Sequence, residues 1–264
     1  MRTNISLLAI LFCLIGHSVL AQPSQSVVNV PTRTGVANRI LLLAPSAPKA
    51  TLILMAGGHG GLQIFANGSV KWGEGNFLIR SKHLFVDQGV ATIVVDAPSD
   101  RQTAPFLGGF RQTNEHAADL KAIIAWAREN LGVPVWVVGT SRGTQSTAWI
   151  ATQLQGADGP DGIVLTSSIL SDPKGRPVPD MQLGKIEIPV LVVHHERDAC
   201  AHCAFSDVVK LTSKLANSPR TQLITFTEGV ASGDPCDAFH YHGYNGIEAD
   251  VVHRIVAWIT TAGP

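Results

Sequence analysis

Charged residues are scarce in this sequence, and neither sign is in excess. Only 15% of the 264 residues are charged, and 20 Lys and Arg balance 20 Asp and Glu, so the formal net charge is zero. Because the chain also lacks a run of Lys and Arg, nothing in it indicates a nucleic-acid partner. Hydrophobic residues make up 45% of the chain, which excludes a disordered polypeptide and is enough for one sizeable core.

The chain also lacks an apolar run of membrane-spanning length. The apolar stretch at residues 5–15 is shorter than the roughly 20 residues that a span needs. This stretch follows the positive charge of Arg2 and precedes a small-residue pattern that ends at Ala21, as in a secretory signal. We therefore predict a signal peptide over residues 1–21 and a single domain over residues 22–264. The mature protein is expected to be secreted or periplasmic, with no membrane anchor after cleavage.

Cysteine is rare as well. Removal of residues 1–21 leaves three cysteines, Cys200, Cys203 and Cys236. In the oxidising compartments reached by exported proteins, a disulfide between two of them is the expected state, with the third left over. The spacing alone does not say which two are paired.

Internal repeats and low-complexity segments are absent, and the mature chain instead alternates between two kinds of segment. Short apolar runs rich in Val, Ile and Leu are typical of strands buried on both faces of a parallel sheet. They predict strands at residues 39–43, 51–55, 91–95, 133–138, 162–166, 189–193 and 221–226. Apolar residues at three- and four-residue steps predict helices at residues 115–131 and 246–260. This alternation predicts the α/β fold class, with a doubly wound, mostly parallel sheet, helices on both faces and sites at the carboxyl ends of strands.

A serine between two glycines follows one of the predicted strands. Residues 139–143 read Gly-Thr-Ser-Arg-Gly, a GxSxG pattern between the strand 133–138 and a helical stretch that begins near Gly143. The pattern arises by chance in roughly one chain in ten of this length, so its position matters more than its letters. At the apex of a tight strand-to-helix turn, a serine has a strained backbone and an exposed hydroxyl beside the N–H groups of the helix. Ser141 is therefore a candidate nucleophile, and the alternative is a turn serine without chemistry.

The segment VWVVGTSRGTQS around this serine resembles the nucleophile elbow of the α/β-hydrolase superfamily. Members of that superfamily carry their catalytic residues in the chain order nucleophile, acid, histidine. The resemblance implies an acid in the loop after a late strand, where Asp198 follows the predicted strand 189–193. Glu196 and Asp172 are the alternatives, and His195 stands where the family usually has a glycine.

The resemblance also implies a histidine between the last strand and the last helix. His242-Gly243-Tyr244 is similar to the family's His-Gly-aromatic ending, and His240 is the alternative. The implied catalytic triad is therefore Ser141, Asp198 and His242, in a small, lid-poor member that resembles serine esterases.

An oxyanion hole needs two backbone N–H groups that point at the same spot. The resemblance implies that one belongs to Arg142, directly after the nucleophile, and the other to the glycine-rich turn at residues 56–61. Within this turn we favour the N–H of Gly58, with that of His59 next, although Ala56 stands where the family has a histidine. The turn nearly matches a dinucleotide-binding fingerprint but lacks its first glycine, so we expect no nucleotide cofactor.

The cysteines and histidines near the implied acid allow two interpretations. Cys200, His202 and Cys203 are residue types that bind zinc. In the implied fold, however, the acid and histidine loops are neighbours, so a disulfide from Cys236 to either Cys200 or Cys203 would tie them together and pre-organise the triad. We favour the disulfide, and we expect neither a metal nor another cofactor.

The resemblance implies hydrolysis of a carboxylic ester, or a related acyl bond, through an acyl-enzyme on Ser141. His242 would be the general base and Asp198 the acid that orients it. An acyltransferase with the same triad and a non-catalytic binding or metal-handling protein are the alternatives. Residues 167–188 leave no room for a full lid, which favours a small soluble ester as the partner over an emulsified lipid. The sequence specifies neither the acyl group, nor the alcohol, nor the oligomeric state.

Overall fold

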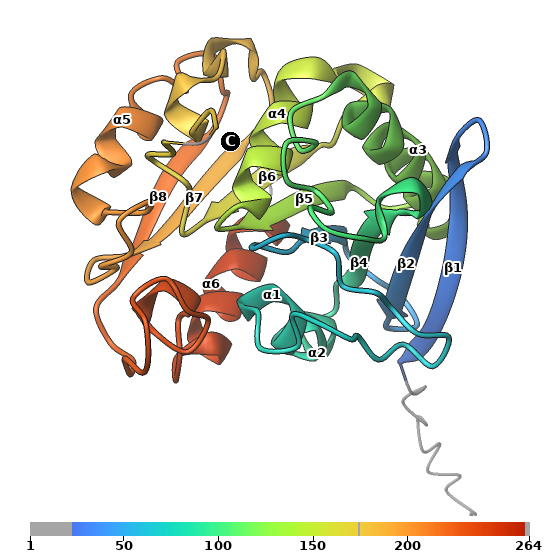
Figure 1. Cartoon of the computed structure of the whole chain (residues 1–264), viewed down its shortest axis with the longest axis horizontal. Coiled ribbons are helices and arrows are strands. Elements are labelled where there is room, and N and C mark those ends of the chain that lie inside the picture. Colours follow the sequence, from blue (N-terminus) through green and yellow to red (C-terminus); the bar gives the residue numbers. More distant parts are fainter. Residues whose placement is uncertain (1–22, 174, 262–264) are drawn as a thin grey trace, which may run out of the picture.

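The computed structural model describes residues 23–173 and 175–261, so the predicted signal peptide lies outside the described residues. These residues form one eight-stranded sheet (Figure 1). Its strands lie side by side in the order β1 (Ser24–Arg33), β2 (Val36–Ala44), β4 (Ala91–Pro98), β3 (Thr51–Met55), β5 (Val135–Thr140), β6 (Gly162–Thr166), β7 (Val190–His195) and β8 (Thr221–Phe226).

The sheet is mostly parallel. Neighbouring strands from β4 to β8 run parallel, whereas β1 and β2 are antiparallel at one edge. The sequence pattern did not predict β1, because an edge strand is not buried on both faces and Val30 is its one buried residue. Strand β5 begins at Val135, two residues later than predicted, and runs to Thr140, directly before Ser141.

Helices cover both faces of the sheet, as predicted. Helices α1 (Phe77–Arg80), α2 (Lys82–Asp87) and α6 (Glu248–Thr260) lie on one face, and α3 (Asn114–Leu131), α4 (Gly143–Gln153) and α5 (Val208–Thr212) lie on the other (Figure 1). Strand β3 shows how one apolar run serves two cores. Its residues Leu52 and Leu54 pack into the core on the face covered by α1, α2 and α6, and Ile53 and Met55 pack into the core on the face covered by α3, α4 and α5. This is because successive strand residues point to opposite faces of a sheet.

The two helices predicted from apolar periodicity are α3 and α6. Helix α3 begins after Thr113, whose side chain accepts a hydrogen bond from the His116 N–H, and ends at Gly132 in the left-handed conformation. The helical stretch expected near Gly143 is α4. The short helices α1, α2 and α5 were not predicted, since four to six residues show no clear helical period.

The segment where a lid would be inserted is short. Within the described part of residues 167–188, the regular structure is two turns of 3-10 helix, Val178–Asp180 and Leu183–Lys185. Across the described ranges, no helix combines the length and the hydropathy needed to cross a membrane.

Candidate active site

Ser141 occupies a strained turn between β5 and α4. Its φ of 51° lies in the left-handed region, which a residue with a side chain rarely adopts. Three hydrogen bonds hold the turn. The Ser141 N–H donates to the Thr166 carbonyl of the neighbouring strand (3.1 Å), and the Ser141 carbonyl accepts from both the N–H (2.9 Å) and the hydroxyl (2.6 Å) of Thr144. The sheet and the helix together therefore fix the serine in a conformation that it would not choose alone.

The two glycines of the GxSxG pattern are required by close backbone approaches. A Cβ on Gly143 would lie 2.0 Å from the carbonyl oxygen of Met55, at the end of β3. A Cβ on Gly139 would lie 2.6 Å from the Gly143 carbonyl oxygen. Side chains two positions before and after Ser141 would therefore collide with the backbone.

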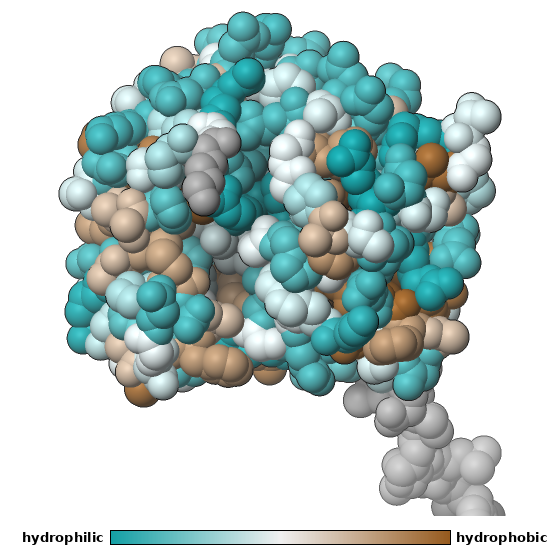
Figure 2. All heavy atoms as spheres, viewed as in Figure 1, coloured by the Kyte–Doolittle hydropathy of each residue, from teal (hydrophilic) through white to brown (hydrophobic). Residues whose placement is uncertain are grey.

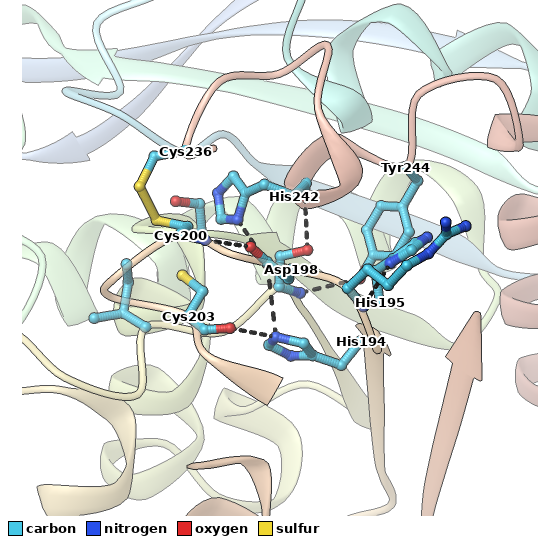
Figure 3. A network of polar contacts seen from close by, with 12 residues as sticks. His194, His195, Asp198, Cys200, Cys203, Cys236, His242 and Tyr244 are labelled. Carbon is cyan, nitrogen blue, oxygen red and sulfur yellow. Dashed lines mark hydrogen bonds and ion pairs between the residues drawn. A yellow bond between two sulfur atoms is a disulfide. The ribbon is translucent and has the colours of Figure 1, made fainter. Parts of the chain in front are cut away.

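Asp198 and His242, which lie 44 residues apart in the chain, contact each other (Figure 3), and His242 lines the same cavity as Ser141. Asp198 follows β7, and His242 lies in the 3-10 turn Tyr241–Gly243 between β8 and α6. The His242 Nδ1 is 2.9 Å from the Asp198 Oδ2, and both side chains are buried. Since the carboxylate accepts, we assign the proton to Nδ1, which leaves Nε2 free to accept a proton. The other carboxylate oxygen, Oδ1, accepts the Cys200 N–H at 3.0 Å.

The alternatives for the acid and the base lie elsewhere. Glu196 accepts a hydrogen bond from the Thr225 hydroxyl (2.7 Å), and Asp172 forms an ion pair with Arg142 (2.7 Å). The backbone N–H of His240 donates to the Asp237 carbonyl, and its ring packs edge-on against Tyr241.

Two polar residues to which the sequence analysis gave no role in the site hold the loop that carries His242 in place. The Ser167 hydroxyl donates to the His242 carbonyl (2.7 Å), and the Ser167 N–H donates to the Tyr244 hydroxyl oxygen (3.1 Å). Tyr244 in turn donates to the carbonyl of Val193 in β7 (2.8 Å), and burial raises the pKa of its hydroxyl. These contacts tie the loop that carries His242 to the ends of β6 and β7. They link residues far apart in the chain, so no local sequence signal marks them.

A second histidine lies beneath Asp198. The His194 Nε2 is 2.7 Å from the Cys203 carbonyl oxygen and 3.6 Å from the Asp198 Oδ2 (Figure 3). Burial lowers the pKa of His194, so the ring is neutral at neutral pH and its Nε2–H donates to the carbonyl. His194 thus fixes the chain beyond the acid without adding a second positive charge next to His242.

A disulfide joins Cys200 to Cys236, which confirms the predicted link between the acid and histidine loops and selects Cys200 as the partner (Figure 3). Cys203 is a free thiol in the interior, and burial raises its pKa well above the usual value. Donor atoms of Cys200, Cys203 and His242 lie within 4.8 Å of one another, a separation that a metal could bridge. However, the Cys200 sulfur is committed to the disulfide, which leaves two of the three ligands, so this group does not fit a metal ion.

The glycine-rich turn after β3 lies directly against the serine. A Cβ on Gly57 would be 3.0 Å from the Ser141 Cβ. Gly58 has a φ of 56°, and its exposed backbone faces the site. In the described part of the chain, neither the Gly58 N–H nor the Arg142 N–H donates a hydrogen bond. The two N–H groups that the sequence singled out therefore have no acceptor among the described residues.

Two cavities meet at this turn, on a molecule whose face in Figure 2 is mostly hydrophilic and hollowed near its centre. The first, of about 380 Å³, is lined by Gly58, Ser141 and His242, together with Trp72 and the disulfide residue Cys236. The second, of about 630 Å³, is lined by Gly58 and by three arginines: Arg111, Arg142 and Arg176. The His59 ring contacts the rings of Trp72 and Phe106, with distances between ring centroids of 3.8 Å and 4.5 Å. Burial lowers the pKa of His59, which favours the neutral ring.

No family model matches the chain, and no curated protein matches it in sequence. Solved structures, in contrast, are similar over most of its length. An α/β serine hydrolase homologue from Coxiella burnetii has a TM-score of 0.61 at 14% identity, over 90% of this chain and 100% of that chain. An esterase from Pyrococcus furiosus has a TM-score of 0.64 at 13% identity, over 90% of each chain. A serine hydrolase without a lid from Xanthomonas campestris has a TM-score of 0.58 at 14% identity, over 93% of this chain and 99% of that chain. The protein therefore has the α/β-hydrolase fold, as the elbow sequence implied.

Proposed function

We propose that this protein is a serine hydrolase that cleaves a carboxylic ester, or a related acyl bond, through an acyl-enzyme on Ser141. One observation carries the proposal: a strained serine and a histidine paired to a buried carboxylate line the same cavity. Three loops that are distant in the chain contribute these groups. Such a constellation is the arrangement that activates a hydroxyl for attack on a carbonyl carbon.

The roles follow from the positions of the groups. The Ser141 Oγ attacks the carbonyl carbon while the His242 Nε2 takes its proton, and Asp198 stabilises the imidazolium that forms. The carbonyl oxygen becomes an oxyanion, which the N–H groups of Gly58 and Arg142 bind. His242 then gives its proton to the leaving oxygen as the ester bond breaks. Water, activated by the same histidine, attacks the acyl-enzyme and releases the acid.

The shape of the site supports a small soluble ester as the substrate. The short segment 167–188 leaves both cavities open to solvent, and the similar Xanthomonas campestris protein is described as lacking a lid. The names of the similar structures, serine hydrolase and esterase, support the reaction class. The leader-like residues 1–21 and the Cys200–Cys236 disulfide support an exported, single-domain protein over residues 22–264, either secreted or periplasmic.

A fluorophosphonate probe tests the proposal, because it phosphonylates only an activated serine. Purified protein lacking residues 1–21 is treated with the probe and weighed by mass spectrometry beside Ser141→Ala and Ser171→Ala. The second variant is a matched control, since Ser171 lies outside both cavities. We expect one adduct on the wild type and on Ser171→Ala, and none on Ser141→Ala. Absence of an adduct on folded, oxidised wild type would overturn the assignment. Adding an alcohol acceptor to an ester assay then separates hydrolysis from acyl transfer.

A further inference from the structure

A buried arginine lies beneath the glycine-rich turn. Arg111 precedes helix α3, and only 5% of its surface is exposed. Its Nη2 donates to two carbonyl oxygens of the turn, that of Ala56 at 3.0 Å and that of Gly58 at 3.1 Å. A Cβ on Gly60 would lie 2.6 Å from the same nitrogen, so the absence of a side chain at this position leaves room for the guanidinium.

The other end of the guanidinium is also held in place. The Arg111 Nη1 donates to the Ser146 hydroxyl oxygen in α4 (3.0 Å), and Ser146 is hydrogen-bonded to the His116 Nε2 in α3 (2.9 Å). Burial, with two nearby arginines, lowers the pKa of His116 to about 3, so the ring adds no second charge beside Arg111 at neutral pH. Two helices therefore fix the orientation of Arg111 relative to the turn.

Arg111 carries a charge that its surroundings do not balance. No carboxylate of the described residues forms an ion pair with it, and its hydrogen bonds go to neutral acceptors. Burial and the nearby Arg142 lower the pKa of Arg111 to about 9, which leaves the guanidinium protonated at neutral pH. Burying a charge without a partner is unfavourable, so a polar requirement of the turn explains an arginine here better than packing does.

We propose that Arg111 is a positioning residue that holds the Gly58 N–H in the orientation required to bind the oxyanion. The two carbonyls that it binds belong to the peptide groups on either side of the one that carries this N–H. Peptide groups are planar, and glycine rotates freely about its own dihedrals, so an unrestrained Gly57–Gly58 peptide could turn its N–H away from the site. With both neighbours tied to one nitrogen, the backbone on either side of this peptide is fixed, which restricts the conformations that the turn can adopt. This inference rests on the proposed serine-hydrolase function.

Three variants test it. Arg111→Lys keeps the charge but cannot reproduce the forked contacts, and Arg111→Met removes the charge. Arg128→Met is the matched control, because Arg128 lies on α3, pairs with Asp161 at 2.9 Å and lines neither cavity. Loss of one oxyanion donor lowers kcat by about 10²–10³-fold. We expect a kcat loss approaching this for both Arg111 variants, a KM within about threefold of the wild type, and wild-type kinetics for Arg128→Met.

Inhibitors separate this role from a purely structural one. A trifluoromethyl ketone forms an oxyanion on the serine, so its affinity should fall with kcat in the Arg111 variants. The affinity of the product alcohol, which is neutral and forms no oxyanion, should stay unchanged. If both affinities fall together, or if folded Arg111→Lys retains the wild-type kcat, the proposal is wrong.

The amide NMR signal of Gly58 provides a readout that does not require activity. We expect it to shift in Arg111→Lys and to stay unmoved in Arg128→Met. An unmoved Gly58 signal in folded Arg111→Lys would overturn the inference. Failure of the proposed function has a different signature, namely an unlabelled, inactive wild type, and the amide spectra would still report whether Arg111 holds the turn.

Discussion

The Cys200–Cys236 disulfide should contribute a large and measurable part of the stability. It closes a loop with a sequence separation of 36, which contains α5 and β8. In the chain-entropy model, a cross-link over a loop of this length stabilises the folded state by about 4 kcal/mol at 25 °C, because the unfolded chain loses freedom. We therefore expect the double variant Cys200→Ser/Cys236→Ser to lose about 4 kcal/mol of unfolding free energy.

Urea denaturation measures this loss. With a slope of about 3 kcal/mol per molar urea, suitable for a chain of this size, the midpoint should fall by about 1.3 M. A reducing agent should lower the midpoint of the wild type by a similar amount and leave the double variant unchanged. Cys203→Ala is the control, since it removes a buried thiol but keeps the cross-link, and it should cost only about 1 kcal/mol. A midpoint drop below about 0.4 M, or an equal effect of reductant on both proteins, would refute the reasoning.

The same variant should lose activity even where it is still folded. The Cys200 N–H holds the Asp198 Oδ1 at 3.0 Å, and Cys236 lines the cavity that contains His242. Releasing the cross-link loosens both loops, so we expect kcat to fall by about tenfold with a smaller change in KM. Ester hydrolysis measured well below the urea midpoint checks this. An unchanged kcat would show that Asp198 and His242 stay in position without the disulfide.

Three further predictions concern single residues. Asp198→Asn should leave the fold intact but lower kcat about 10⁴-fold, because an amide does not hold the Nδ1–H tautomer of His242. Steady-state kinetics measure the loss, and circular dichroism checks the fold. A loss below tenfold would contradict the assignment of Asp198 as the acid. Gly143→Ala should destabilise the protein by about 3 kcal/mol, because the new Cβ would lie 2.0 Å from the Met55 carbonyl oxygen. Urea denaturation measures this loss, and a wild-type midpoint would show that the close contact between Gly143 and Met55 is not required. His116 has a folded pKa of about 3 against an ordinary 6.5, so the unfolded state binds its proton first as the pH falls from 6.5 towards 3. Stability should therefore fall by up to about 1.4 kcal/mol for each pH unit that the pH is lowered in this window. His116→Gln should flatten the profile of urea midpoints against pH. Equal slopes for the wild type and His116→Gln would exclude His116 as the cause of the pH dependence.

Local pattern was sufficient for most of the fold. Strands β3 and β6 lie at their predicted bounds, because a continuous apolar run between turn residues suits a strand buried on both faces. The edge strand β8 also lies at its predicted bounds, although half of its residues are exposed. Strand β1 was missed because only Val30 of its ten residues is buried, so it lacks the apolar run on which the prediction depends. Helices α3 and α6 carry an apolar stripe long enough to show its period, unlike α1, α2 and α5.

In the candidate site, too, residues with a local sequence signal were predicted and residues held by distant contacts were not. Ser141 was recognisable because the geometry of its turn imposes glycines at fixed positions around it. Ser167, Tyr244 and Arg111 were not assigned, although each makes hydrogen bonds that position the site. Their contacts span from 51 to 77 residues of chain, and a sequence pattern of a few residues carries no trace of a partner at that distance.

By itself, the sequence determined the alternation of strand and helix, the strained serine turn and the chain order of the residues that resemble a triad, because each depends on neighbouring residues. Only the tertiary structure decided which loops touch. It placed Asp198, and not Glu196, against His242, and it paired Cys236 with Cys200 while burying Cys203 as a free thiol. The physical reason is that these choices depend on distances of a few ångströms between loops, which are set by the packing of the sheet and its two helical layers.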